Sequence, residues 1–262
     1  MHPIVNIAVR AARRGANVLL RNMDLINDLE ITTKGSRDLV SEVDRTAERE
    51  IIEVVHRAYP GHAILAEESG KQPGEEYEWI IDPLDGTFNY LHNVPHFCVS
   101  IGVRARGRIE HGVVYDPMRE ELFTASRGEG AMLNNRRIRV SRRTQLDEAL
   151  FATGFAAAGA EFRAFEQTLH DLNITSTLRQ TGSAALDLAY VAAGRYDGFF
   201  ELSLEPWDMA GGALLVREAG GMVGDPDGSE NYLESGNIVA GNVKLFRDLL
   251  RTVHRGLKVA HQ

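Results

Sequence analysis

Acidic residues follow apolar segments at several points in this sequence. The apolar segment 63–66 is followed by Glu67, and the segment 79–81 is followed by Asp82 and then by Asp85. A carboxylate that leaves an apolar strand is partly desolvated, which is costly unless a cation neutralises it. Several such carboxylates would repel one another unless a divalent metal lay between them. Because carboxylate and carbonyl oxygens select hard ions, the pattern predicts a site for Mg²⁺ or Mn²⁺.

Two further carboxylates stand in the second half of the chain. The segment 199–200 is followed by Glu201, and Asp208 lies where a helix is expected to begin. Taken alone, Asp208 has a plainer explanation as a helix cap, and acidic residues after a strand commonly belong to solvated loops. The prediction of one shared site rests on the joint occurrence and the order of these residues.

The turn after Asp82 also suits an anion. Pro83 restricts the backbone, so that Asp82 and Asp85 can face a common centre with the Leu84 carbonyl between them. The residues that follow are expected to begin a helical turn whose free N–H groups can bind phosphate, and they are Gly86 and Thr87. Metal ligands beside a phosphate site favour phosphoryl transfer.

A second group of backbone N–H donors precedes another predicted helix. It consists of Gly182, Ser183 and Ala184. Like the first group, these donors stand just ahead of a helix.

The bulk composition restricts the class of protein. The chain has 262 residues, which is ample for a core, and its formal net charge of -8 disfavours direct nucleic-acid binding, which needs clustered Lys and Arg. Cys98 is the single cysteine, so an intramolecular disulfide is excluded, and its apolar neighbours predict a core position. No apolar stretch approaches the ~18 residues that span a bilayer, and no secretory signal is evident, so we expect a cytoplasmic protein.

Periodicity predicts the elements that position these residues. Apolar residues at helical spacing predict a first helix from residue 4 to 19, and a second from about Val43 to Tyr59 with Ser41 as its N-cap. A polar loop, 33–38, is expected between them. Short strands are expected at 63–66, 79–81, 97–104, 108–115 and 121–125, as an antiparallel meander with hairpins. Beyond about residue 150, strands and helices alternate, which is typical of a mixed or parallel sheet covered by helices.

These segments resemble, in order and over nearly the whole chain, the inositol monophosphatase family. The matching segments are KGSRDLVS (34–41) with Asp44, AEES (66–69), WIIDPLDGTFNY (79–90), RQTGSAA (179–185), PWDMAGG (206–212) and EAGG (218–221). Tyr90 departs from the pattern, since many members have Phe there. Glu205 places an extra negative charge before Asp208. Within the family, residues 1–13 and 181–195 are similar to the bacterial SuhB-type members.

The resemblance implies a role for each matching position. Glu67, Asp82 and the Leu84 carbonyl would hold a first metal ion, and Asp82, Asp85 and Asp208 would hold a second, with a weaker third ion near Glu67. Asp44 and Thr87 would orient and help to deprotonate the attacking water, and Lys34 would assist near the third ion. Gly86 and Thr87 would bind the phosphate. The polyol would contact Gly182, Ser183, Ala184, Glu201, Asp85 and Asp208.

The resemblance also implies the fold and its organisation. We expect an α/β (α+β) fold, the layered αβαβα sandwich of the inositol monophosphatase and fructose-1,6-bisphosphatase type. Residues 1–262 would form a single catalytic unit, with an N-terminal α+β half (1–148) that carries a largely antiparallel sheet and a C-terminal α/β half (149–262) that carries a mixed sheet. The family commonly forms dimers, so we expect a homodimer.

The activity implied is hydrolysis of myo-inositol 1-phosphate and related polyol phosphates, with Mg²⁺ required and Li⁺ inhibitory. An interaction role is the alternative, since SuhB-type proteins act in transcription antitermination with Nus factors and RNA polymerase. A third reading changes the substrate to fructose 1,6-bisphosphate or a nucleotide phosphate, and the lack of an extra basic cluster near the motifs counts against it.

Overall fold

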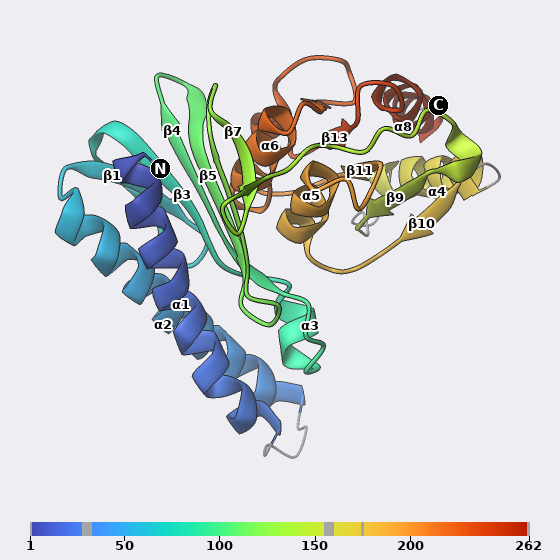
Figure 1. The fold of residues 1–262 in the computed structure, drawn as a ribbon. Coiled ribbons are helices and arrows are strands. Elements are labelled where there is room, and N and C mark those ends of the chain that lie inside the picture. Colours follow the sequence, from blue (N-terminus) through green and yellow to red (C-terminus); the bar gives the residue numbers. More distant parts are fainter. Residues whose placement is uncertain (1, 28–32, 155–159, 174–175, 261–262) are drawn as a thin grey trace.

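Helices and sheets alternate in five layers (Figure 1). The computed structural model describes residues 2–27, 33–154, 160–173 and 176–260. The layers are, in order, α1 (Pro3–Asn27) with α2 (Thr33–Ala58), an eight-stranded sheet, α5 (Ala184–Ala192) with α6 (Pro206–Glu218), a five-stranded sheet, and α4 (Ala160–Asn173) with α8 (Phe246–Ala260). The predicted αβαβα sandwich is confirmed.

The first sheet is a meander with one parallel pair of strands next to its edge strand. Its strands are β1 (His62–Ala66), β2 (Gly70–Gln72), β3 (Glu75–Asp85), β4 (Cys98–Ala105), β5 (Arg108–Asp116), β6 (Glu121–Ser126), β7 (Gly130–Leu133) and β8 (Arg136–Arg137), in the order β2-β1-β3-β4-β5-β6-β7-β8. Strands β3 to β6 are antiparallel, as predicted, and β7 and β8, which were not predicted, continue the antiparallel order. The expectation was wrong for β1, which pairs parallel to β3 with Ala66 opposite Ile81. The reason is that β2 folds back on β1, so the chain re-enters the sheet beside β1 in the same direction.

The second sheet is mixed, as predicted. It consists of β9 (Leu150–Thr153), β10 (Thr177–Arg179), β11 (Gly198–Glu201), β12 (Met222–Gly224) and β13 (Ile238–Gly241), in the order β10-β9-β11-β13-β12. Strand β9 is parallel to both its neighbours, whereas β13 is antiparallel to β11 and β12. The short elements η1 (Leu146–Glu148), α3 (Thr87–Leu91) and α7 (Tyr232–Ser235) complete the described chain.

The second helix begins earlier than predicted. It starts at Thr33 rather than Val43, so the segment 33–38 is helical and Ser41 lies inside the helix instead of capping it. The prediction followed the apolar periodicity, which begins only at Val43, and took Gly35 as a sign of a loop. A single glycine destabilises a helix by only about 1 kcal/mol relative to alanine, and the neighbouring Lys, Arg and Leu residues have high helix propensity.

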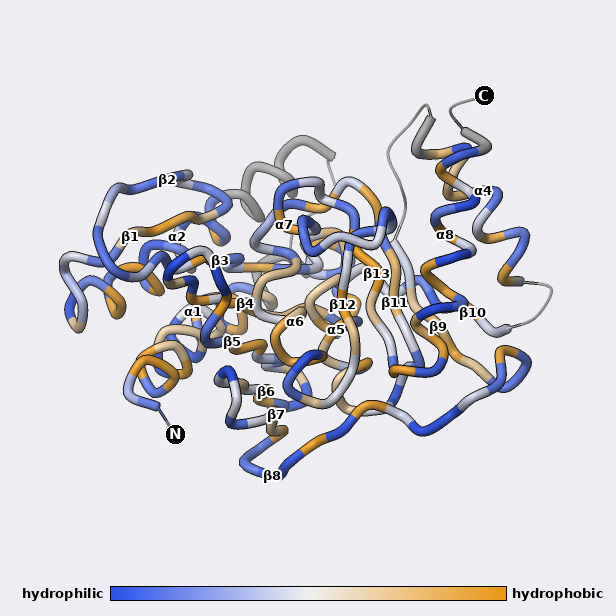
Figure 2. The backbone as a smooth tube through the Cα atoms, turned by 90° about the horizontal axis from the view of Figure 1, so that it is seen from above, coloured by the Kyte–Doolittle hydropathy of each residue, from blue (hydrophilic) through white to orange (hydrophobic). Residues whose placement is uncertain are grey.

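Three hydrophobic clusters fill the spaces between the layers, and apolar residues concentrate on the inner strands and on α5 and α6 (Figure 2). Two glycines let α6 approach the first sheet closely. A Cβ on Gly102 would lie 2.6 Å from the Ala210 Cβ, and one on Gly112 would lie 2.6 Å from the Gly211 carbonyl oxygen. Within the described residues, no helix has both the length and the apolarity needed to cross a membrane.

Candidate active site

Three aspartates from distant parts of the chain meet beside the first sheet. Asp82 and Asp85 lie at the end of β3, and Asp208 lies in the first turn of α6. Each offers a carboxylate oxygen, and the three atoms lie within 4.8 Å of one another. Asp82 and Asp85 are only 2% and 8% exposed. Three converging carboxylates with so little water are the donor set that a hard divalent cation requires.

Hydrogen bonds orient all three aspartates before any cation binds. The Leu84 N–H donates to Asp82 Oδ1 at 2.9 Å, and the Glu205 N–H donates to Asp208 Oδ2 at 2.8 Å. Asp85 Oδ2 accepts hydrogen bonds from the Ser183 hydroxyl and from a backbone N–H of α5, at 2.5 and 2.8 Å. Asp208 therefore both caps α6 and belongs to the cluster, so that the two explanations of this residue are compatible.

Two further carboxylates, Glu67 and Asp44, lie beside the three aspartates. Parallel pairing of β1 with β3 places Glu67 beside Asp82, and the Glu67 N–H donates to the Ile81 carbonyl at 3.2 Å. Asp44 reaches the cluster from α2 and is 3% exposed. Its Oδ1 atom is buried and has no hydrogen-bond partner among the described residues. A buried carboxylate oxygen without a donor, beside other carboxylates, is the arrangement that a cation would satisfy.

The carboxylates of the cluster have raised pKa values, and burial is the main cause for each of them. Burial, followed by repulsion from Glu67, raises the pKa of Asp44 to about 8. Burial raises the pKa of Glu67 to about 7 although part of this side chain is exposed, and burial followed by Asp85 raises the pKa of Asp208 to about 7. Burial also raises the pKa of Asp82 well above its usual value. Cation binding would replace protons on these groups, so the residues present fit a divalent metal.

The predicted phosphate site lies next to the aspartates. Gly86 has a φ of 101° and precedes the short helix α3. Only glycine adopts this left-handed conformation without strain, and it turns the chain from β3 into the first N–H groups of α3. The Thr87 hydroxyl donates to the Leu84 carbonyl at 3.1 Å. Thr87, predicted to orient water, and Leu84, predicted to bind metal, thus contact each other directly.

The three residues of the second predicted loop, Gly182 to Ala184, differ in exposure. Gly182 is exposed and has a φ of 82°, whereas Ser183 is 2% exposed and its hydroxyl binds Asp85. Ser183 therefore faces the cluster rather than the open side where a polyol would lie. Ala184 is buried at the start of α5. Of the three predicted residues Gly182, Ser183 and Ala184, Gly182 is the exposed one.

Glu201 lies at the end of β11 against the backbone of Gly154, where a Cβ would come within 1.8 Å of Glu201 Oε1. Burial, with added repulsion from Asp187 and Asp85, raises the pKa of Glu201 well above its usual value. The structure thus brings Glu201 into the same group of carboxylates. Lys34 lies in the first turn of α2, but its side chain is outside the described residues.

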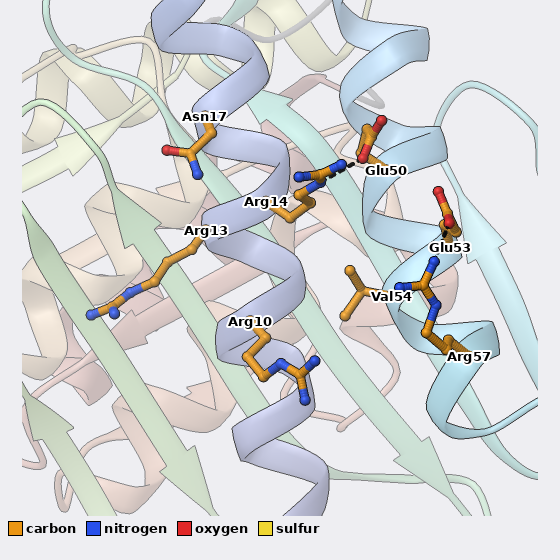
Figure 3. Close-up of a pocket in the computed structure, with 8 residues that line it drawn as sticks. All are labelled: Arg10, Arg13, Arg14, Asn17, Glu50, Glu53, Val54 and Arg57. Carbon is orange, nitrogen blue, oxygen red and sulfur yellow. Dashed lines mark hydrogen bonds and ion pairs between the residues drawn. The ribbon is translucent and has the colours of Figure 1, made fainter.

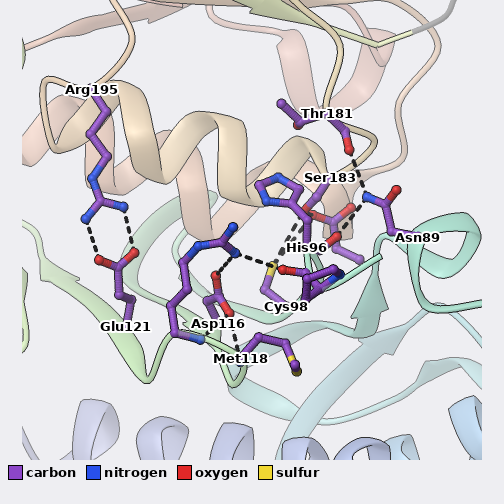
Figure 4. Close-up of polar contacts among 12 residues, drawn as sticks. Asn89, His96, Cys98, Asp116, Met118, Glu121, Thr181, Ser183 and Arg195 are labelled. Carbon is purple, nitrogen blue, oxygen red and sulfur yellow. Dashed lines mark hydrogen bonds and ion pairs between the residues drawn. The ribbon is translucent and has the colours of Figure 1, made fainter. Parts of the chain in front are cut away.

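Three contributors to this site were missed in the sequence. Asn89 donates to the Thr181 and His96 carbonyls, at 2.8 Å each, and ties α3 to the second loop (Figure 4). Cys98 was expected only in the core, yet its Sγ lies 3.6 Å from Asp85 Oδ2. Glu48 binds two backbone N–H groups next to Glu67. The sequence feature that could have revealed Glu48 is its position one helical turn after Asp44, which places both residues on the same face of α2.

A separate hollow of about 380 Å³ lies on the outer face of α1 and α2 (Figure 3). Arginines and glutamates line it, and Arg14 pairs with Glu50 at 2.6 Å while Arg57 pairs with Glu53 at 2.5 Å. None of the clustered carboxylates lines this hollow, and its glutamates are already paired. The aspartate cluster is therefore the stronger candidate for chemistry.

Comparisons with known proteins show which family the chain resembles over nearly its whole length. The family model described as the inositol monophosphatase family matches residues 1–257. The chain is 51% identical over 269 residues to Nus factor SuhB of Escherichia coli (strain K12), covering 99% of both proteins. The native crystal structure of extragenic suppressor protein suhB from Bartonella henselae is 39% identical, with a TM-score of 0.89 over 97% of this chain and 100% of that one. An IMPase of Thermotoga maritima is 31% identical, with a TM-score of 0.86 over 99% and 100% of the two chains. The chain belongs to the inositol monophosphatase family, whose members are phosphatases and generally depend on metal.

Proposed function

We propose that this protein is a Mg²⁺-dependent, Li⁺-sensitive phosphomonoesterase that hydrolyses myo-inositol 1-phosphate and related polyol phosphates. The observation that carries the proposal is the convergence of Asp82, Asp85 and Asp208 within 4.8 Å beside the start of α3. Such a cluster attracts divalent cations, and the neighbouring N–H groups attract an anion. A phosphate ester supplies that anion.

The chain offers ligands for more than one ion. Glu67, Asp82 and the Leu84 carbonyl would hold one Mg²⁺, and Asp82, Asp85 and Asp208 would hold a second, with a third near Glu67. When bound, such ions supply acidity to a water molecule and neutralise charge that develops on phosphate and leaving group.

The chain's own groups then position and deprotonate the reactants. The N–H groups of Gly86 and Thr87 bind phosphate oxygens. Asp44, whose buried Oδ1 has no described donor, accepts the proton of the attacking water. The water oxygen bonds to phosphorus, the phosphorus–oxygen ester bond breaks, and the polyol oxygen takes up a proton from solvent water. Lys34 would assist near the third ion.

The polyol end of the substrate would meet an acidic surface. Glu201, Asp85 and Asp208 accept hydrogen bonds from hydroxyl groups, and the exposed Gly182 allows the substrate to approach the backbone. Carboxylates repel a second phosphate, so this surface favours a monophosphate over fructose 1,6-bisphosphate.

The test is phosphate release from myo-inositol 1-phosphate across a Mg²⁺ titration, with and without Li⁺. We expect turnover that requires Mg²⁺, falls with Li⁺ and collapses in Asp85→Asn. Asp248→Asn is the matched control, because Asp248 is a partly exposed aspartate of α8, outside the cluster, whose carboxylate pairs with Arg251. Absence of turnover by folded wild type with Mg²⁺ would contradict the inositol phosphate assignment and redirect the search to other phosphate esters.

A second role is favoured by the relatives called Nus factor, which match 99% of this chain. We propose that this protein also acts in transcription antitermination by binding Nus factors and RNA polymerase, as a homodimer in the cytoplasm. The net charge of -8 supports protein contacts rather than direct RNA binding. Binding assays with purified Nus factors and polymerase test it: we expect Asp85→Asn to bind as the wild type does. No complex with either partner would contradict the role, and sedimentation analysis would test the dimer.

A further inference from the structure

Glu48 is a buried carboxylate that the proposed reaction does not use. It lies on α2 one helical turn after Asp44 and is 2% exposed. Residues four positions apart on a helix share a face, so Asp44 and Glu48 both point toward the first sheet. Asp44 reaches the aspartate cluster, whereas Glu48 reaches the turn between β1 and β2.

Both oxygens of Glu48 bind the backbone of that turn. The Glu68 N–H donates to Oε2 at 2.8 Å, and the Ser69 N–H donates to Oε1 at 2.9 Å. These are the residues immediately after Glu67, which would ligate the first metal. On its other side, Glu67 is held by its own N–H bond to Ile81 in β3. Glu67 is therefore fixed from both sides, by β3 and by Glu48.

Burying the Glu48 carboxylate costs more free energy than a purely structural contact requires. Glu48 forms no ion pair within the described residues, so its charge is buried against backbone N–H groups alone. Removing a carboxylate from water costs several kcal/mol, and two such hydrogen bonds recover only part of it. A neutral residue would hold a turn at lower cost. An additional negative charge beside the cluster, however, helps to attract a cation.

We propose that Glu48 is a positioning residue of the metal centre, which holds the Glu67 turn in its ligating position against Asp44. The inference rests on the proposed metal-dependent function. Because α2 carries both Asp44 and Glu48, the helix sets the distance between the base and the turn that bears the metal ligand. Residues that hold metal ligands in place without binding the metal themselves typically lower metal affinity ~10- to 100-fold when they are mutated.

The test is Mg²⁺ binding to the full-length metal-free protein, measured by calorimetry without substrate. We expect Glu48→Gln to weaken binding of the first ion ~10-fold or more, because the amide keeps one acceptor but loses the charge and the second acceptor. Glu48→Ala should weaken it further. Glu53→Gln is the matched control, since Glu53 is an exposed glutamate of the same helix, outside the cluster, and the variant removes the same charge.

Hydrogen exchange of the metal-free wild type gives an independent readout. The peptide that contains the Glu68 and Ser69 amides should be protected in the wild type and in Glu53→Gln, and should exchange faster in Glu48→Gln. Fast exchange in the wild type, or equal Mg²⁺ affinity in Glu48→Gln and Glu53→Gln, would overturn the inference while leaving the proposed function intact. Absence of Mg²⁺ binding by the wild type would overturn both.

Discussion

The Ser183 hydroxyl donates a 2.5 Å hydrogen bond to Asp85 Oδ2, between residues that lie 98 positions apart in the chain. Asp85 ends β3 of the first sheet, and Ser183 stands immediately before α5. The backbone N–H of Ala185 donates to the same oxygen at 2.8 Å. One oxygen of Asp85 is thus held by the second half of the molecule, so the orientation of this carboxylate depends on how the two sheets pack around α5.

Ser183→Ala should therefore weaken metal binding more than it slows chemistry. Burial raises the pKa of Asp85, and the Ser183 hydroxyl opposes that rise, so its loss disfavours the ionised, ligating form. We expect ~10-fold weaker Mg²⁺ activation, with most of the turnover restored at saturating Mg²⁺. The measurement is a Mg²⁺ titration of phosphate release. Ser176→Ala is the control, because that hydroxyl donates to the Leu172 carbonyl at the end of α4; equal titrations for the two variants would contradict the role of Ser183.

Without metal, the protein should lose stability as the pH rises from 6.5 to 8. The pKa of Asp44 is raised to about 8, and those of Glu67 and Asp208 to about 7, far above the values of an unfolded chain. In this window the folded protein binds more protons than the unfolded one, so the free energy of unfolding falls with pH. The histidines with lowered pKa, His62, His96 and His111, act at lower pH, below about 6.5, where protonation of the unfolded chain destabilises the fold.

Urea unfolding at pH 6.5 and 8, with EDTA or Mg²⁺, measures this effect. Mg²⁺ should stabilise the protein more at pH 8, because it then displaces fewer protons. Asp44→Asn should reduce the pH dependence of the metal-free protein, whereas Asp248→Asn should not. A metal-free free energy of unfolding that rises between these pH values would contradict the prediction.

Gly112→Ala should disturb both stability and metal binding. The new Cβ would lie 2.6 Å from the Gly211 carbonyl oxygen, so α6 must move away from the first sheet. Overpacking of this kind costs ~1–3 kcal/mol. Because Asp208 lies on the same helix, we also expect weaker Mg²⁺ binding. Gly61→Ala is the control, since nothing lies within 4 Å of its Cβ position; unfolding and calorimetry that fail to separate the two variants would contradict the close approach.

Tyr90→Phe should cost stability and leave catalysis unchanged. The Tyr90 hydroxyl donates to the Leu19 carbonyl at 2.7 Å and ties α3 to α1, which gives a reason for a tyrosine at this position. Loss of one buried hydrogen bond costs ~1 kcal/mol. Chemical denaturation measures it, with Tyr77→Phe as a control, because Tyr77 is only half buried and no hydrogen bond of its hydroxyl is found within the described residues. An unchanged midpoint for Tyr90→Phe would show that this bond contributes nothing.

Local pattern was sufficient for the parts of the site that neighbours in sequence build. Residues 82–87 could be assigned because a proline, two aspartates and a glycine within one turn have few ways to arrange themselves, and the structure has the expected turn into α3. The apolar runs predicted β1, β3 to β6 and the helices α5 and α6 for the same reason. The start of α2 was missed, because its first ten residues carry no apolar period and a helix there differs little in free energy from a loop.

The sequence alone determined which residue types carry the chemistry, and through the family pattern it determined the layered fold. Only the tertiary structure decided how these residues are held: β1 runs parallel to β3 and places Glu67 beside Asp82, the Ser183 hydroxyl donates to Asp85, and Glu48 binds the turn after Glu67. Each of these depends on pairings between segments far apart in the chain. Such pairings are set by the packing of whole layers, and no local spacing encodes them.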